Sequence, residues 1–137
     1  MARNVFVYLP VKDLRRSIRF FSQLGFCFDP RFTDDRAACL MVSTTTRAML
    51  ITAPRFRRSV PAGVCDARVC NEVLIALTLD NRIAVDQMIA NALAAGGSTL
   101  GDPRDDGITY QHGFRDPDGH LWEVLHVVEE QAEAVPG

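Results

Sequence analysis

The sequence predicts an α+β fold built from two consecutive modules, each with the order strand–helix–strand–strand–strand. Two amphipathic helical segments each follow a β-prone run and end at a glycine. The strand-to-helix junctions at Val11 and Leu79, like the helix-ending Gly25 and Gly96, are about 70 residues apart. This repeat favours a duplicated module over a chance succession of elements.

The first module begins with Asn4–Pro10, a β-prone run that is ended by a proline. Apolar residues then recur at helical spacing from Leu14 to Leu24. Asp13 is placed to cap this helix, and Gly25 is placed to end it. Three short strands are expected after the helix, at 26–29, 37–43 and 48–53.

The second module repeats this order after an irregular stretch that contains two prolines, a glycine and several arginines. Its helix is expected at 83–95, with Val85, Ile89 and Leu93 on one face. The expected strands are 72–79, 98–100, 109–115 and 120–127. We therefore divide this single domain into a first module (1–54), a linker (55–70), a second module (71–128) and a flexible acidic tail (129–137).

Composition narrows the classes of partner. The net charge of −2 gives no general attraction to nucleic acid or to an anionic membrane. No apolar run approaches the ~20 residues of a membrane span, and the N-terminus passes directly into a strand without a visible signal peptide. We therefore expect a cytoplasmic protein. The densest basic cluster, Arg55, Arg57 and Arg58, fits a solvated loop or a mouth that attracts an anionic ligand.

The chain has four cysteines and no Cys-x-x-Cys pair. In a reducing compartment they are expected to be free thiols, with Cys27 and Cys39 as small core residues. A disulfide or metal clip between Cys65 and Cys70 is a less favoured alternative.

Two segments resemble the vicinal oxygen chelate superfamily, which comprises glyoxalase I, bleomycin- and fosfomycin-resistance proteins and extradiol dioxygenases. The segment from Leu9 to Phe26, LPVKDLRRSIRFFSQLGF, is similar to the opening of that fold. The segment from Phe114 to Leu125, FRDPDGHLWEVL, is similar to its closing hairpin. The resemblance covers about residues 4–128. It implies that the modules form a cup-shaped, partly open barrel and that the protein is a homodimer, often with modules of different chains completing one cavity.

In the metal-dependent members of this superfamily, four side chains hold one divalent ion. The resemblance places Phe6, Ile51, Leu74 and Glu123 at these four positions. Only Glu123 carries a donor atom, since metal sites require N, O or S ligands. The expectation is therefore no metal and no other cofactor. The histidines all lie on the last two strands and cannot replace donors on the first and fifth: His112, His120 and His126.

If the Glu123 side chain faces the cup, the alternation of side chains along each strand determines which other residues face it. Trp122 and Val124 then point back toward a helix, and an apolar, partly aromatic pocket with one carboxylate and one phenol takes the place of the metal site. The predicted ligand-binding residues are Phe6, Tyr8, Met49, Ile51, Leu74, Ala76, His112, Glu123 and Leu125.

A lone carboxylate on an apolar strand face is costly to bury without a partner. Glu123 could pair with an arginine or with Tyr8, accept a hydrogen bond from a ligand, or act as a general base. No nucleophile or oxyanion donor stands beside it in the sequence, so no catalytic residue is assigned.

The function that we expect is metal-free binding of a hydrophobic or aromatic small molecule, such as an antibiotic, by a protein of the bleomycin-resistance type. The alternative is an enzyme, similar to glyoxalase I (a lactoylglutathione lyase or isomerase). A third possibility is a filled cup and a role in contacting another protein.

Overall fold

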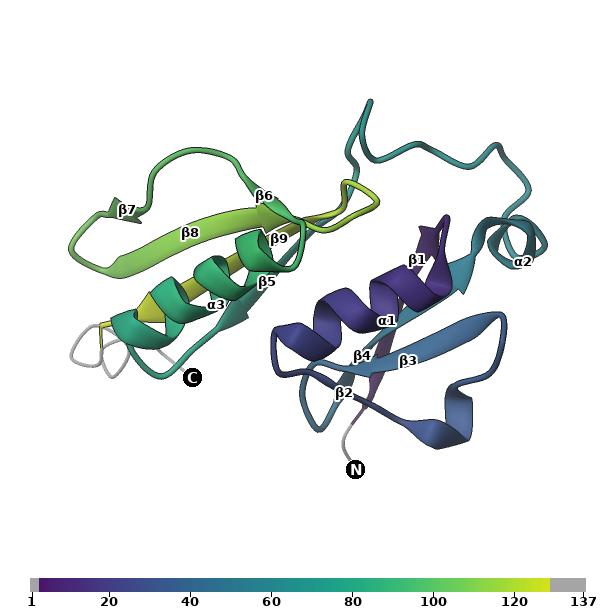
Figure 1. Cartoon of the computed structure of the whole chain (residues 1–137), viewed down its shortest axis with the longest axis horizontal. Coiled ribbons are helices and arrows are strands. Elements are labelled where there is room, and N and C mark those ends of the chain that lie inside the picture. The colour runs from purple at the N-terminus through teal and green to yellow at the C-terminus, as the bar shows by residue number, and fades with distance from the viewer. Residues whose placement is uncertain (1–2, 129–137) are drawn as a thin grey trace.

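The computed structural model describes residues 3–128, so the predicted tail at 129–137 lies outside the described part (Figure 1). Its first half is a four-stranded sheet, here called sheet A, in the order β1-β4-β3-β2, with β1 parallel to β4. The elements of this half are β1 (Val5–Val11), α1 (Leu14–Gln23), β2 (Cys27–Phe28), a 3₁₀ turn (Pro30–Phe32), β3 (Ala37–Met41) and β4 (Thr46–Thr52).

The second half repeats this plan in sheet B, with the order β5-β9-β8-β6 and β5 parallel to β9. Its elements are β5 (Leu74–Thr78), α3 (Arg82–Ala94), β6 (Ser98–Thr99), β7 (Arg104–Asp105), β8 (Thr109–Arg115) and β9 (Leu121–Val127). The α+β class and the two strand–helix–strand–strand–strand modules are thus confirmed. The two sheets do not close into a barrel.

Several details differ from the sequence prediction. Cys27, which was expected in the core, is exposed. Helix α2 (Ala53–Arg57) occupies the start of the segment predicted to be irregular, because Pro54 in its first turn presets φ and lacks an N–H that would be unpaired there. Strand β7 was not predicted. On α3 the buried residue is Ala92 instead of Leu93, whose side chain is half exposed.

One hydrophobic core joins the two modules. Helix α1 lies against the second module as well as against its own sheet, and two tilted aromatic contacts mark the junction. The ring centroids of Phe21 and Trp122 are 5.0 Å apart, and those of Phe20 and Phe114 are 5.9 Å apart. All four rings are almost fully buried, which is worth several kcal/mol each by area, on the order of 25 cal/mol per Å². Trp122 is therefore a core residue, as its strand register predicted.

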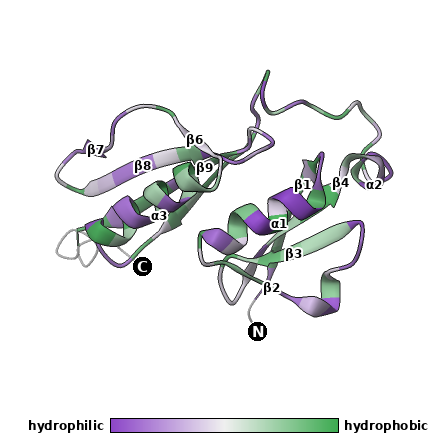
Figure 2. Ribbon diagram, viewed as in Figure 1, coloured by the Kyte–Doolittle hydropathy of each residue, from purple (hydrophilic) through white to green (hydrophobic). Residues whose placement is uncertain are grey.

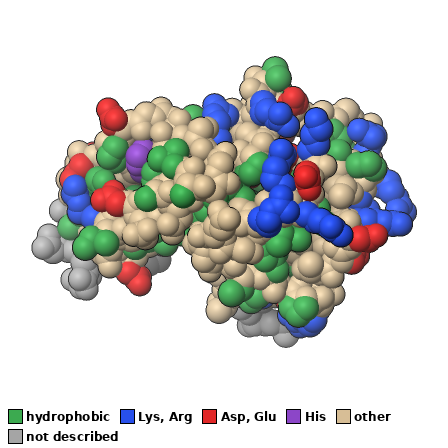
Figure 3. All heavy atoms as spheres, viewed as in Figure 1, with side chains coloured by type: hydrophobic (Ala, Val, Ile, Leu, Met, Phe, Trp, Pro, Cys, Tyr) green, Lys and Arg blue, Asp and Glu red, His purple; other side chains and the backbone are tan. Residues whose placement is uncertain are grey.

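Hydrophobic residues and basic residues are concentrated in different parts of the fold. Figure 2 shows hydrophobic residues along β3, which has four buried residues in succession. Figure 3 shows that Lys and Arg side chains gather over the first module and the linker. Arg55, Arg57 and Arg58 are exposed, and Arg57 borders a shallow hollow of about 570 Å³ together with Lys12 and Arg68. Between residues 3 and 128, no helix is long and apolar enough to cross a membrane.

Candidate functional site

Each sheet has one face toward the helices and one face away from them, and we call the second its cup face. In sheet A the cup face carries Phe6 and Tyr8 of β1, with Met49 and Ile51 of β4 beside them. In sheet B it carries Leu74, Ala76, Glu123 and Leu125, since Leu74 pairs with Leu121 and Ala76 pairs with Glu123. Eight of the nine predicted ligand-binding residues thus lie on the faces expected from strand alternation.

The cup face of sheet A is only partly open. Met49 and Ile51 are buried, and with Ala37 and Cys39 they form a small apolar cluster under Phe56 of α2. Phe6 and Tyr8 remain 41% and 50% exposed. The Phe6 ring meets the ring of Phe32 edge-on at 6.0 Å. A molecule that approaches this face would therefore meet Phe6 and Tyr8 first.

The cavity at the cup face of sheet B has both apolar and charged residues on its border, with Asp102 and Arg104 among the charged ones. Glu123 is half-buried and borders a cavity of about 500 Å³ with Leu74, Gln111 and Leu121. No side chain or N–H group within residues 3–128 donates to this carboxylate in the hydrogen bonds found there. Among those residues, neither the pairing with Tyr8 nor a pairing with an arginine is formed.

The three histidines have other surroundings. His112 pairs across the sheet with Val124, on the face opposite Glu123, and its Nε2 atom lies 2.8 Å from the carbonyl oxygen of Gly101. It still forms part of the border of the cavity beside Glu123. His120 Nε2 lies 2.7 Å from the Pro10 carbonyl oxygen, and His126 Nδ1 lies 3.2 Å from that of Leu79.

The four positions of the superfamily's metal site do not fit a metal ion. Phe6 and Ile51 lie on sheet A, and Leu74 and Glu123 lie on sheet B. The side chains of Phe6, Ile51 and Leu74 carry no N, O or S atom that could bind a metal ion. Within residues 3–128, no three His, Cys, Asp or Glu side chains gather closely enough to hold an ion. We therefore derive no chemistry through a metal at this site.

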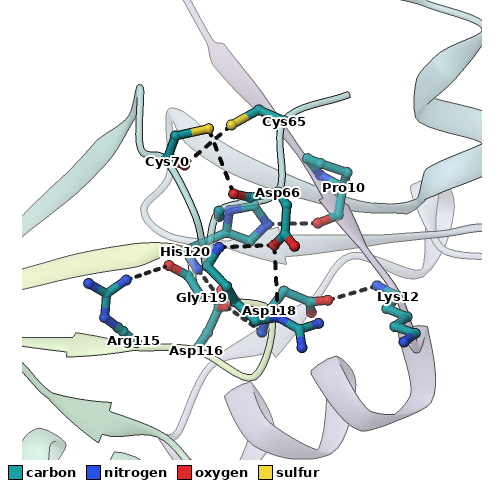
Figure 4. Close-up of polar contacts among 12 residues, drawn as sticks. Pro10, Lys12, Cys65, Asp66, Cys70, Arg115, Asp116, Asp118, Gly119 and His120 are labelled. Carbon is teal, nitrogen blue, oxygen red and sulfur yellow. Dashed lines mark hydrogen bonds and ion pairs between the residues drawn. The ribbon is translucent and has the colours of Figure 1, made fainter. Parts of the chain in front are cut away.

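The closing turn of the second module has a role that the sequence analysis missed. Asp118 is buried, and its carboxylate accepts hydrogen bonds from the Lys12 backbone N–H at 2.8 Å and the Ser17 hydroxyl at 3.3 Å (Figure 4 shows the Lys12 contact). Arg16 adds an ion pair at 3.5 Å. The turn that precedes β9 is thus bound to the start of α1, more than 100 residues away in the chain.

Asp116 organises the same turn from inside. Its carboxylate accepts hydrogen bonds from the backbone N–H groups of Asp118 and His120, at 2.9 and 3.0 Å, and from the Trp122 indole at 3.1 Å. Burial raises the pKa of Asp116, because the charged form loses its contact with water. These three bonds fix the direction in which β9 leaves the turn, and therefore the position of Glu123.

A second, smaller cavity of about 290 Å³ lies between the end of β1 and the linker. It is mostly apolar, and it lies away from Glu123. Its border includes Tyr8, Pro10, Phe56, Cys65, Cys70 and His120. Within one chain, Tyr8 and Glu123 thus face different cavities, and the two halves of the predicted cup do not enclose one space.

Comparison with known proteins agrees with this architecture. Residues 4–124 match the family model described as "Glyoxalase/Bleomycin resistance protein/Dioxygenase superfamily". The hypothetical protein SA1046 from S. aureus has 27% sequence identity and a TM-score of 0.78, and the match covers 92% of this chain and 95% of that one. No curated protein matches the chain.

Two further solved structures share the fold at lower identity. A glyoxalase-related enzyme from Fulvimarina pelagi has 20% identity and a TM-score of 0.78, over 92% of this chain and 88% of that one. TnmS3, an antibiotic binding protein from Streptomyces sp. CB03234, has 18% identity and a TM-score of 0.65, over 93% and 98%. With its duplicated modules and a family match that covers most of its length, this chain belongs to the Glyoxalase/Bleomycin resistance protein/Dioxygenase superfamily.

Proposed function

We propose that this protein binds a hydrophobic or aromatic small molecule, such as an antibiotic, and that it does so without a metal ion. The proposal rests on the residue types at the four metal positions. Phe6, Ile51 and Leu74 occupy three of them, so that Glu123 is the one side chain of the four that could coordinate a metal ion. A site of this composition holds an organic molecule through apolar area and orients it with a few polar groups. The antibiotic-binding structural neighbour TnmS3 supports the choice of ligand class.

Glu123 is the orienting group in this proposal. Its half-buried carboxylate has no donor among residues 3–128, and such a group gains most from a ligand that brings an N–H or a cation. Phe6 and Tyr8 supply exposed aromatic surface, which suits a planar ring system. The preferred ligand is therefore planar, largely apolar and equipped with at least one hydrogen-bond donor.

We further propose that two chains form a homodimer in which the cup face of sheet A in one chain faces that of sheet B in the other. The support is the amount of apolar surface that one chain leaves uncovered there: Phe6 is 41% exposed, Tyr8 50% and Leu74 54%. Surfaces of this kind mark sites of association. A symmetric dimer would bring Tyr8 and Glu123 of different chains to one cavity, twice.

The dimer is tested by placing a charge on the cup face. Leu74→Asp changes an exposed side chain and should leave the fold intact, but it should shift the sedimentation coefficient from dimer to monomer. Ile83→Asp, at a residue of α3 that is 78% exposed, is the matched control and should remain dimeric. A wild-type protein that sediments as a monomer at high concentration contradicts the proposed assembly.

Binding is tested with daunorubicin and bleomycin as probes, by thermal shift and by fluorescence titration. A ligand present at 100 times its Kd should stabilise the folded protein by about 2.7 kcal/mol. Glu123→Gln should weaken the binding of daunorubicin, which is cationic, about tenfold or more. Asp35→Asn, at an exposed site, should leave this binding unchanged. If neither these probes nor a wider set of planar compounds raises the melting temperature, the binding function is wrong and a filled cup is favoured. Stoichiometric metal in protein purified without added metal would instead favour an enzyme.

A further inference from the structure

The linker contains a pair of thiols that the proposed function does not use. Cys65 and Cys70 are both exposed, and the Cys65 thiol donates a hydrogen bond to the Cys70 carbonyl oxygen at 3.3 Å. The Cys70 thiol points back to the Asp66 carbonyl oxygen at 3.9 Å, and Figure 4 shows both sulfur atoms on the same side of the turn. Each thiol thus lies beside the backbone of the short segment that joins the two cysteines.

The backbone between them is held in a tight turn. The N–H groups of Val69 and Cys70 both donate to the carbonyl oxygen of Asp66, at 2.9 and 3.0 Å. The Asn71 side chain adds a bond to the Ala67 carbonyl oxygen at 3.0 Å. The thiols are therefore kept next to each other by structure that forms without a bond between them, which is the condition for a disulfide that needs little backbone movement.

We propose that Cys65 and Cys70 form a reversible intramolecular disulfide, and that this pair is an oxidation-sensitive modification site in the wall of the smaller cavity. Both residues border that cavity together with Tyr8 and Pro10. The oxidant is a hydroperoxide. In a reducing compartment, exposed cysteine pairs of this kind are typically transient or redox-sensing, not structural.

The chemistry takes place in two balanced steps. The Cys70 thiolate attacks one oxygen of hydrogen peroxide, which breaks the O–O bond, releases hydroxide and leaves a sulfenic acid on Cys70. The Cys65 sulfur then attacks the Cys70 sulfur, so that the S–S bond forms and the sulfenic oxygen leaves as water.

The surroundings set this order. The contact with Cys70 raises the pKa of the Cys65 thiol, and partial burial and nearby acidic groups act in the same direction. Cys65, whose thiol proton is directed at the Cys70 carbonyl oxygen at 3.3 Å, therefore acts as the second, resolving thiol. Cys27 is exposed as well, but no other cysteine contacts it among residues 3–128, so it serves as an internal control.

Peptide mapping tests the proposal, because trypsin cuts between the two cysteines. Cleavage after Arg58, Arg68 and Arg82 places Cys65 on peptide 59–68 and Cys70 on peptide 69–82. After peroxide treatment and alkylation of the full-length protein, these two peptides should be joined and should separate on addition of dithiothreitol. Cys27 should be recovered as the alkylated thiol.

The single variants separate the steps. Cys65→Ser should stop at a sulfenic acid on Cys70 that dimedone traps, whereas Cys70→Ser should leave Cys65 mostly unoxidised. In the native oxidised protein, cleavage after Arg68 should slow several-fold, while cleavage after Arg58 should keep its rate. Oxidation of Cys65, Cys70 and Cys27 at one rate without joined peptides overturns the proposal, and so does a disulfide between chains.

Discussion

A glycine in the closing turn offers a sharp test of how the linker packs on the second module. Gly119 has φ = +88°, and a Cβ atom there would lie 2.8 Å from the Arg68 Cγ, 3.0 Å from its backbone nitrogen and 3.1 Å from the Ala67 carbonyl carbon. Gly107 has nearly the same angle, φ = +87°, but has open space at the corresponding position. Comparing Gly119→Ala with Gly107→Ala therefore separates the cost of backbone strain from the cost of displacing the linker.

The magnitudes follow from these two terms. Alanine at a positive φ costs roughly 1–2 kcal/mol, and this is the whole loss of unfolding free energy expected for Gly107→Ala. At position 119, backbone atoms of the linker must also move, and overpacking of this kind costs about 1–3 kcal/mol more. Gly119→Ala should thus lose about 2–5 kcal/mol.

Urea denaturation followed by Trp122 fluorescence measures both losses, and the m-value checks that the unfolding transition stays two-state. Native trypsin cleavage after Arg68 should also become faster in Gly119→Ala only. Equal losses in the two variants, with unchanged cleavage after Arg68, would refute the packing of the linker turn on the closing turn.

Two further predictions concern buried or paired carboxylates. Asp118→Ala removes the acceptor of two hydrogen bonds and one partner of an ion pair, and it should lower the unfolding free energy by about 2–4 kcal/mol. Asp35→Ala, on the surface, should change it by less than about 0.5 kcal/mol. Urea denaturation measures both changes. Hydrogen bonds from Arg31 lower the pKa of Asp29 from 3.8 to about 2. A depressed acid pKa stabilises the fold above about pH 4, and this contribution is lost as the pH falls toward 2. Arg31→Gln should reduce the acid dependence of unfolding between these pH values, and a pH series of melting temperatures that matches the wild type would contradict this assignment.

The elements of this fold could be predicted because their signals are local. Asp13 and Asn81 cap α1 and α3 in the structure, each accepting a hydrogen bond from the N–H three residues later. The sequence was a weaker guide to which residues of α3 face the core. Counting in fours from Val85 and Ile89 leads to Leu93, but the buried face of α3 continues one residue earlier, at Ala92. Both steps are compatible with 3.6 residues per turn, so only packing could decide between them.

The candidate site was predictable only to the level of a strand face. Alternation placed Tyr8, Ile51, Leu74 and Glu123 on the faces that they occupy. It could not show what covers a face, and Ile51 proved to be buried beneath Phe56 of an unpredicted helix. Nor could it show that one chain leaves the two cup faces apart, because that depends on how α1 and sheet B share a core.

The closing turn was recognised in the sequence as part of a segment similar to the superfamily's closing hairpin, yet the function of its carboxylates depends on contacts across the whole chain. Asp118 binds the Lys12 N–H and the Ser17 hydroxyl, and both groups belong to the segment that opens the fold. The two segments that carry the resemblance to the superfamily are therefore one structural unit, in which the start of α1 and the turn before β9 hold the modules together. None of these bonds involves the metal positions. A chain can thus keep this signature for the stability of its fold while Phe6 and Leu74 replace the metal ligands, so the signature specifies the architecture and leaves the chemistry of the cup free to change.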